Sequence, residues 1–120
     1  FLSSLPLGLL SVAILTVNNV RDFTEDRKNH KMTLVARFGP FFGKLQYTLC
    51  FVLAFVFPFI LLRHGFMSTY GILPLIITMA SIPLVKSIWK QQGVTLNDLL
   101  ANTAKFLVIY SIGFSLGWVL

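Results

Sequence analysis

Charged residues are scarce in this chain of 120 residues. Asp, Glu, Lys and Arg make up 12% of it, whereas about 25% is usual in soluble domains, and only four residues are acidic. Hydrophobic residues make up 56%, and the mean hydropathy is +0.80. The scarcity of charge excludes a soluble globular domain, and the composition indicates an integral membrane protein.

Cysteine is scarce as well, and a basic leader is missing. Cys50 is the only cysteine, which excludes an internal disulfide and a metal site built from paired thiolates. The chain starts at Phe1 inside an apolar run and lacks the basic segment that opens a signal peptide. We therefore expect the chain to be a piece of a longer protein.

The sequence contains four long apolar runs. A helix needs roughly 20 residues to cross a hydrocarbon core. Runs of about this length lie at residues 1–20, 45–62, 66–85 and 98–120. The sequence therefore predicts an all-α fold, a polytopic membrane helix bundle with four transmembrane helices, as a single transmembrane domain over residues 1–120.

The basic residues predict how these helices are oriented. The loop at 21–44 holds six Lys and Arg, the turn at Arg63 holds one, and the segment 86–105 holds three. By the positive-inside rule, we expect the first and third loops to face the cytoplasm. We also expect a multi-pass protein of the inner (plasma) membrane. Because the bases lie in loops and not along one polar face, the net charge of +6 does not indicate nucleic acid as a partner.

Polar chemistry is concentrated in residues 18–39, which hold three of the four acidic residues and five of the ten basic ones. Asp22 and Asp26 are four residues apart, so a helix continuing past the first span would carry them on one face, with Asn18 starting the same stripe. Two like charges at this spacing destabilise a helix by roughly 0.2–0.5 kcal/mol. A positive group should therefore compensate them.

Two interpretations of this pair of carboxylates stay open on spacing alone. Neighbouring Arg and Lys side chains could pair with them on a solvated surface. Alternatively, the carboxylates could hold Mg²⁺, which is usually bound by one or two carboxylates together with substrate phosphates, while nearby bases neutralise the phosphate charge. The second interpretation predicts a diphosphate site at a membrane surface.

The wider stretch resembles a known family. Residues 18–27 read N-N-x-R-D-x-x-x-D-R, and residues 31–39 read K-x-T-L-x-x-R-x-G. This pattern is similar to the second aspartate-rich motif of the UbiA superfamily of intramembrane prenyltransferases, and closest to its 1,4-dihydroxy-2-naphthoate polyprenyltransferase branch. The match covers about twenty contiguous residues, and the four-span layout agrees over the rest of the chain.

The resemblance implies a fold and a reaction. Such enzymes are bundles of nine transmembrane helices with two aspartate-rich motifs facing each other, and this chain would be the C-terminal portion with the last four helices, inactive alone. Mg²⁺ bridges the motifs to a polyprenyl diphosphate. The prenyl group passes to 1,4-dihydroxy-2-naphthoate with loss of diphosphate and carbon dioxide, giving demethylmenaquinone for menaquinone biosynthesis.

The resemblance also implies roles for single residues. Asp22 and Asp26 would be the catalytic residues and the metal ligands. Five others would bind the diphosphate or line the same site: Asn18, Asn19, Arg21, Arg27 and Lys31. Two departures stand out, because His30 occupies a position where the family pattern has Gly, and the first aspartate-rich motif is absent from this chain.

Two other functions remain as alternatives. Another aromatic acceptor, such as 4-hydroxybenzoate, would keep the site and change the branch. A transporter or structural membrane subunit would use Asp22 and Asp26 only as partners of nearby bases.

Overall fold

The computed structural model describes residues 1–120 and contains only helices, which confirms the predicted all-α fold class. The elements are η1 (Leu2–Ser4), α1 (Leu5–Arg21), α2 (Phe23–Lys28), α3 (Leu34–Phe38), α4 (Pro40–Arg63), η2 (Thr69–Gly71), α5 (Ile72–Met79), α6 (Ile82–Lys90), η3 (Gly93–Thr95) and α7 (Leu96–Val119).

Four helical segments are long and apolar enough to cross a membrane. They are Leu2–Arg21, Pro40–Arg63, Thr69–Lys90 and Gly93–Val119. The second starts at residue 40, five residues before the uncharged run at 45–62. Pro40 occupies the first turn of α4, where proline fits best, and Lys44 lies in the helix just before the apolar run. Uncharged runs thus locate the membrane-embedded part of a helix and underestimate its length.

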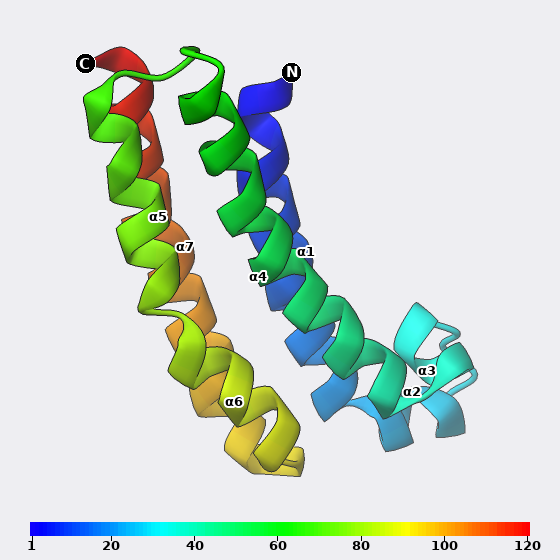
Figure 1. Ribbon diagram of the computed structural model, residues 1–120. Coiled ribbons are helices and arrows are strands. Elements are labelled where there is room, and N and C mark those ends of the chain that lie inside the picture. The colour runs from blue at the N-terminus through cyan, green and yellow to red at the C-terminus, as the bar shows by residue number, and fades with distance from the viewer.

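The helices run alternately up and down, as Figure 1 shows. The helix α1 packs along α4, α7 packs along α5 and α6, and α1 also contacts α7. Both termini and the turn after α4 lie at one end of the bundle (Figure 1). The α2–α3 segment and the loop between α6 and α7 lie at the other end, where α1 contacts η3.

Hydroxyl groups tie α4 to α7 inside the bundle. Thr103 Oγ1 donates to the carbonyl of Leu99 at 2.7 Å, so the Tyr47 hydroxyl, 2.8 Å away, is the donor to Thr103. The Tyr110 hydroxyl donates to the carbonyl of Ala54 at 2.7 Å. These bonds fix how α7 sits against α4 and so how the third loop approaches the first.

The Ala54 carbonyl needs this donor because of Pro58. Pro58 lies inside α4, four residues after Ala54, and has no N–H to give to that carbonyl. A carbonyl left free in an apolar interior is costly, and membrane proteins satisfy it from a neighbouring helix. Tyr110 therefore supplies from α7 the hydrogen bond that α4 cannot make.

Candidate functional site

The polar stretch forms a nearly unbroken helical path from α1 into α2. Asp22 stands between the two helices, yet its N–H donates to Asn18 O at 3.0 Å, and the Asp26 N–H donates to Asp22 O at 2.8 Å. Asn18, Asp22 and Asp26 therefore lie on successive turns. The stripe that the sequence spacing indicates is present in the structure.

Arg21 is the centre of the hydrogen-bond network at this end of the bundle. Its guanidinium binds both oxygens of Asp22, through Nε at 2.8 Å and Nη2 at 3.0 Å. Nη2 also donates to Asn18 Oδ1, and Nη1 donates to Asn97 Oδ1 at 2.8 Å. The network thus joins three predicted site residues to a fourth residue at the start of α7.

The charge of Asp22 follows from this contact. The hydrogen bond from Arg21 lowers the pKa of the Asp22 carboxyl below its ordinary value, the positive charges of Arg21 and Lys31 act in the same direction, and partial burial opposes them. Asp22 is therefore ionised at neutral pH. A carboxylate in this state can act as a hard oxygen ligand.

Asp26 lies deeper than Asp22. Only 6% of the residue is exposed, and its Oδ1 is 3.8 Å from Lys31 Nζ. Its Oδ2 is buried and has no hydrogen-bond partner in the protein. Because buried polar atoms nearly always have a partner, this oxygen has unused capacity for a ligand.

The turn after α2 brings Lys31 back toward Asp26. His30 adopts a left-handed conformation with φ of 56°, the Lys31 N–H donates to Asp26 O at 2.8 Å, and the His30 N–H donates to Arg27 O at 3.3 Å. This is the Schellman arrangement of a helix C-terminus, in which glycine is the usual left-handed residue. The structure therefore explains why the family pattern has Gly at the position of His30.

A polar hollow of about 460 Å³ opens beside this network. It is lined by Arg21, Asp22, Glu25, Gly93, Val94 and Asn97. Sequence reasoning missed Glu25 and Asn97. Glu25 follows Asp22 by three residues and so could have been found by helical spacing, whereas Asn97 lies 76 residues from Arg21 and no local pattern points to it.

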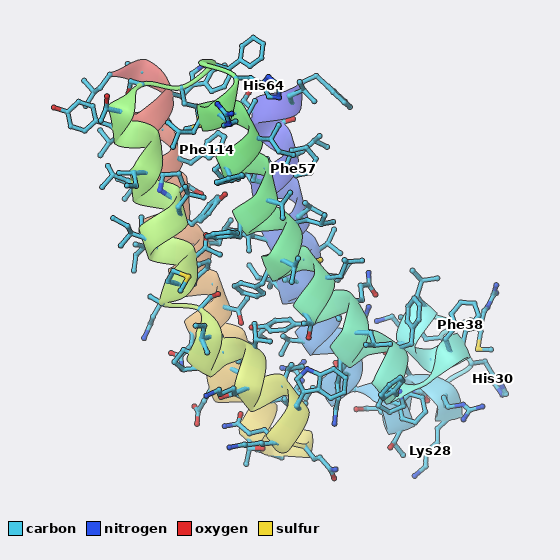
Figure 2. The ribbon with its side chains drawn as sticks, in the orientation of Figure 1. Lys28, His30, Phe38, Phe57, His64 and Phe114 are labelled. Atoms are coloured by element: carbon cyan, nitrogen blue, oxygen red, sulfur yellow. The ribbon has the colours of Figure 1, made fainter.

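Four predicted site residues lie apart from the Arg21 network: Asn19, Asp26, Arg27 and Lys31. Arg27 is exposed, with its guanidinium 5.4 Å from the centre of the Phe23 ring. Asn19 is half-buried and makes no side-chain hydrogen bond, while Lys31 reaches Asp26 only. Figure 2 shows Lys28 and His30 at the outer edge of the α2–α3 corner. The structure thus gathers Asn18, Arg21 and Asp22 and leaves Arg27 free for other contacts.

The donor set of this end fits a hard divalent cation in part. No three Asp, Glu, His or Cys side chains of the chain group together as metal ligands. Two carboxylates are nevertheless what Mg²⁺ usually takes from a protein, with water and phosphate oxygens as its other ligands. The unpartnered Oδ2 of Asp26 is consistent with such a ligand role.

An apolar hollow lies apart from the polar site, between α4 and the α5–α6 segment. Its volume is about 320 Å³, and its lining includes Phe51, Phe55 and Val85, with Lys86 at its edge. It adjoins the break between α5 and α6, where Ser81 Oγ donates to Thr78 O at 2.6 Å. The bundle thus offers an apolar space within its membrane-embedded part.

Fold and site together define the class: an integral membrane protein of up-and-down helices whose carboxylates and bases gather at one end of the bundle. The chain belongs to the UbiA prenyltransferase family, whose family model matches residues 1–118.

Curated relatives agree with this family. The UbiA prenyltransferase domain-containing protein 1 of Homo sapiens is 30% identical over 119 residues, which are 98% of this chain and 33% of that protein. The protein of the same name from Xenopus tropicalis is 30% identical over 120 residues, 99% of this chain and 33% of its own length.

A bacterial protein is similar as well. The 1,4-dihydroxy-2-naphthoate octaprenyltransferase of Escherichia coli (strain K12) is 29% identical over 112 residues, which are 92% of this chain and 36% of that protein. The chain therefore spans about a third of the length of the curated relatives it matches. No solved structure matches it significantly.

Proposed function

We propose that the whole protein transfers a polyprenyl group from a polyprenyl diphosphate to 1,4-dihydroxy-2-naphthoate in menaquinone biosynthesis. The observation that carries this proposal is the pair of carboxylates on successive turns, one held ionised by Arg21 and the other with an unpartnered buried oxygen. The similarity to the Escherichia coli octaprenyltransferase supports this acceptor.

Magnesium is the cofactor that these residues suit. Asp22 and Asp26 would hold it, and bound Mg²⁺ would offset the negative charge that develops on the departing diphosphate. Arg27 follows Asp26 in the sequence and is exposed, and Lys31 is exposed with its ammonium near Asp26. Both side chains are therefore available to a diphosphate. Asn18 and Asn19 would line the same site from the last turns of α1.

The reaction needs no protein nucleophile. The allylic carbon–oxygen bond of the donor breaks and its electron pair leaves with the diphosphate. The carboxylated ring carbon of the acceptor forms the new bond to the prenyl carbon, and loss of carbon dioxide restores the aromatic ring, giving demethylmenaquinone in its quinol form. The apolar hollow between α4 and α5–α6 suits part of a prenyl chain by its lining.

The orientation follows from the basic residues. Six Lys and Arg lie between residues 21 and 44, at the end that carries the carboxylates. By the positive-inside rule this end would face the cytoplasm, with the protein in the inner membrane.

The test uses the full-length protein in membranes with Mg²⁺, a polyprenyl diphosphate and 1,4-dihydroxy-2-naphthoate. Asp22→Asn and Asp26→Asn should each lower turnover by roughly 100-fold or more, measured as prenylated product and released carbon dioxide. Asp98→Asn is the matched control, since Asp98 is exposed on α7 and makes no ion pair.

The outcomes separate the alternatives. Turnover that needs Mg²⁺ and disappears in both variants supports the site and the acceptor together. Turnover only with another aromatic, such as 4-hydroxybenzoate, would keep the site and change the acceptor. No turnover with any acceptor, in protein that is folded, would favour a transporter or structural subunit.

A further inference from the structure

We propose that Asn97 is a positioning residue of the aspartate site, which it serves by holding Arg21 against Asp22. The inference rests on the proposed function, because the carboxylate so positioned is the one assigned to Mg²⁺. The inference also gives Arg21 another role: Arg21 orients a metal ligand and does not bind the diphosphate.

The donors of Arg21 are nearly all in use. A guanidinium has five N–H groups. Two donate to Asp22, one to Asn18 and one to Asn97, which leaves a single N–H on Nη1. Bidentate recognition of a phosphate needs two parallel N–H groups, so this Arg21 has no fork to offer a diphosphate.

Asn97 binds the guanidinium from a different helix than the one that leads to Asp22. Asn18, Arg21 and Asp22 come from one helical path, whereas Asn97 stands in the first turn of α7. Gly93, with φ of 61°, makes the left-handed turn that leads into η3 and α7 beside the first loop. The bond from Arg21 Nη1 to Asn97 Oδ1 thus links the first and third loops at the polar hollow.

This arrangement fixes the orientation of the Asp22 carboxylate and leaves some of its acceptor positions free. A carboxylate has about four acceptor positions, and Arg21 occupies two of them. Because both oxygens are held, the plane of the carboxylate is set, and its remaining positions are available beside the hollow. Removing such a partner of a metal ligand usually weakens metal affinity by about 10- to 100-fold, and Asn97 acts one residue further away.

The experiment measures Mn²⁺ binding by electron paramagnetic resonance in the purified full-length protein, with the metal alone as probe. Asn97→Leu, which keeps the size of the side chain and removes the acceptor, should weaken Mn²⁺ binding by roughly three- to tenfold. Asn97→Asp, which keeps an acceptor oxygen, should stay within about twofold of wild type. Asn102→Leu is the control on the same helix, because Asn102 is exposed and makes no side-chain hydrogen bond.

A double variant tests whether Asn97 acts through Arg21. Arg21→Lys cannot bridge Asn18, Asp22 and Asn97, so adding Asn97→Leu to it should weaken Mn²⁺ binding no further. Additive effects would overturn the proposal. Arg21→Lys that leaves Mn²⁺ affinity unchanged and raises only the KM for the polyprenyl diphosphate would also overturn it, because Arg21 would then contact the donor.

Two failures can be told apart. Wild-type protein that turns over with Mg²⁺, while folded Asn97→Leu binds Mn²⁺ as wild type does, would overturn this inference and keep the proposed function. Wild-type protein that neither binds Mn²⁺ nor turns over would overturn both. The unfolding midpoint of each variant shows whether the protein is folded.

Discussion

The buried side-chain polar atoms of the membrane-embedded interior all have partners, whereas two at the polar end have none. In the interior, Tyr47 bonds Thr103 and Tyr110 bonds the carbonyl of Ala54. The two buried side-chain atoms without a partner, Asp26 Oδ2 and Gln91 Oε1, both lie at the polar end. Unused hydrogen-bonding capacity is costly, and proteins keep it where ligands bind. We therefore expect variants of the interior side chains to change stability, and variants of the carboxylates at the polar end to change binding.

The largest expected effect is at the contact of α7 with η2. A Cβ atom on Gly117 would lie 2.9 Å from Gly71 Cα and 3.0 Å from Tyr70 O, which are backbone atoms that cannot move aside. Gly117→Leu should therefore lower stability by about 1–3 kcal/mol or prevent folding, as seen in a lower unfolding midpoint in detergent.

Gly8 offers the matched control in the same membrane-embedded part. A Cβ atom there meets nothing within 4 Å, so Gly8→Leu should leave the midpoint near that of wild type. Equal effects of the two substitutions would contradict the close packing of α7 on η2.

The next effect concerns the carbonyl freed by Pro58. Tyr110→Phe removes the hydroxyl that bonds Ala54 O and should cost about 0.6 kcal/mol, the average for such bonds between membrane helices, and at most about 1.7 kcal/mol. Pro58→Ala returns an N–H to α4, so the same Tyr110→Phe change should cost less in that background. The unfolding free energies of the four proteins in this double-mutant cycle measure the difference.

The cycle sharpens the comparison between the two regions. A coupling near zero would mean that Tyr110 does not compensate for Pro58. Turnover of Tyr110→Phe should remain close to wild type, because Tyr110 lies in the interior and not at the polar end.

The smallest expected effect is a gain in stability at the polar end. His30 is left-handed, a conformation that costs an L-residue about 1–2 kcal/mol and glycine little. His30→Gly should stabilise the protein by roughly 0.5 kcal/mol, because the greater freedom of glycine in the unfolded chain offsets part of the gain.

A β-branched residue provides the opposite change at this position. His30→Val should destabilise the turn and loosen Lys31, whose N–H is bonded to Asp26 O. A higher unfolding midpoint for His30→Val than for His30→Gly would rule out the Schellman turn.

Sequence reasoning predicted the fold class and part of the arrangement of the candidate site. Spacing placed Asn18, Asp22 and Asp26 on successive turns, because the helical period is a local property that the chain keeps from α1 into α2. It also noted His30 as a departure from a glycine position. It did not find that Asp26 is buried and Asp22 less so, since burial depends on what packs against a helix from elsewhere.

The sequence by itself determined that this chain crosses a membrane as helices and carries its carboxylates and bases at one end. Hydropathy and periodicity are summed over neighbouring residues, so they can be read without knowing the contacts. Only the tertiary structure decided that Asn97 meets Arg21 and that Tyr110 serves the carbonyl freed by Pro58. Each of these contacts joins residues more than fifty positions apart, and such pairs meet only once packing and turns have fixed how α7 lies against α1 and α4.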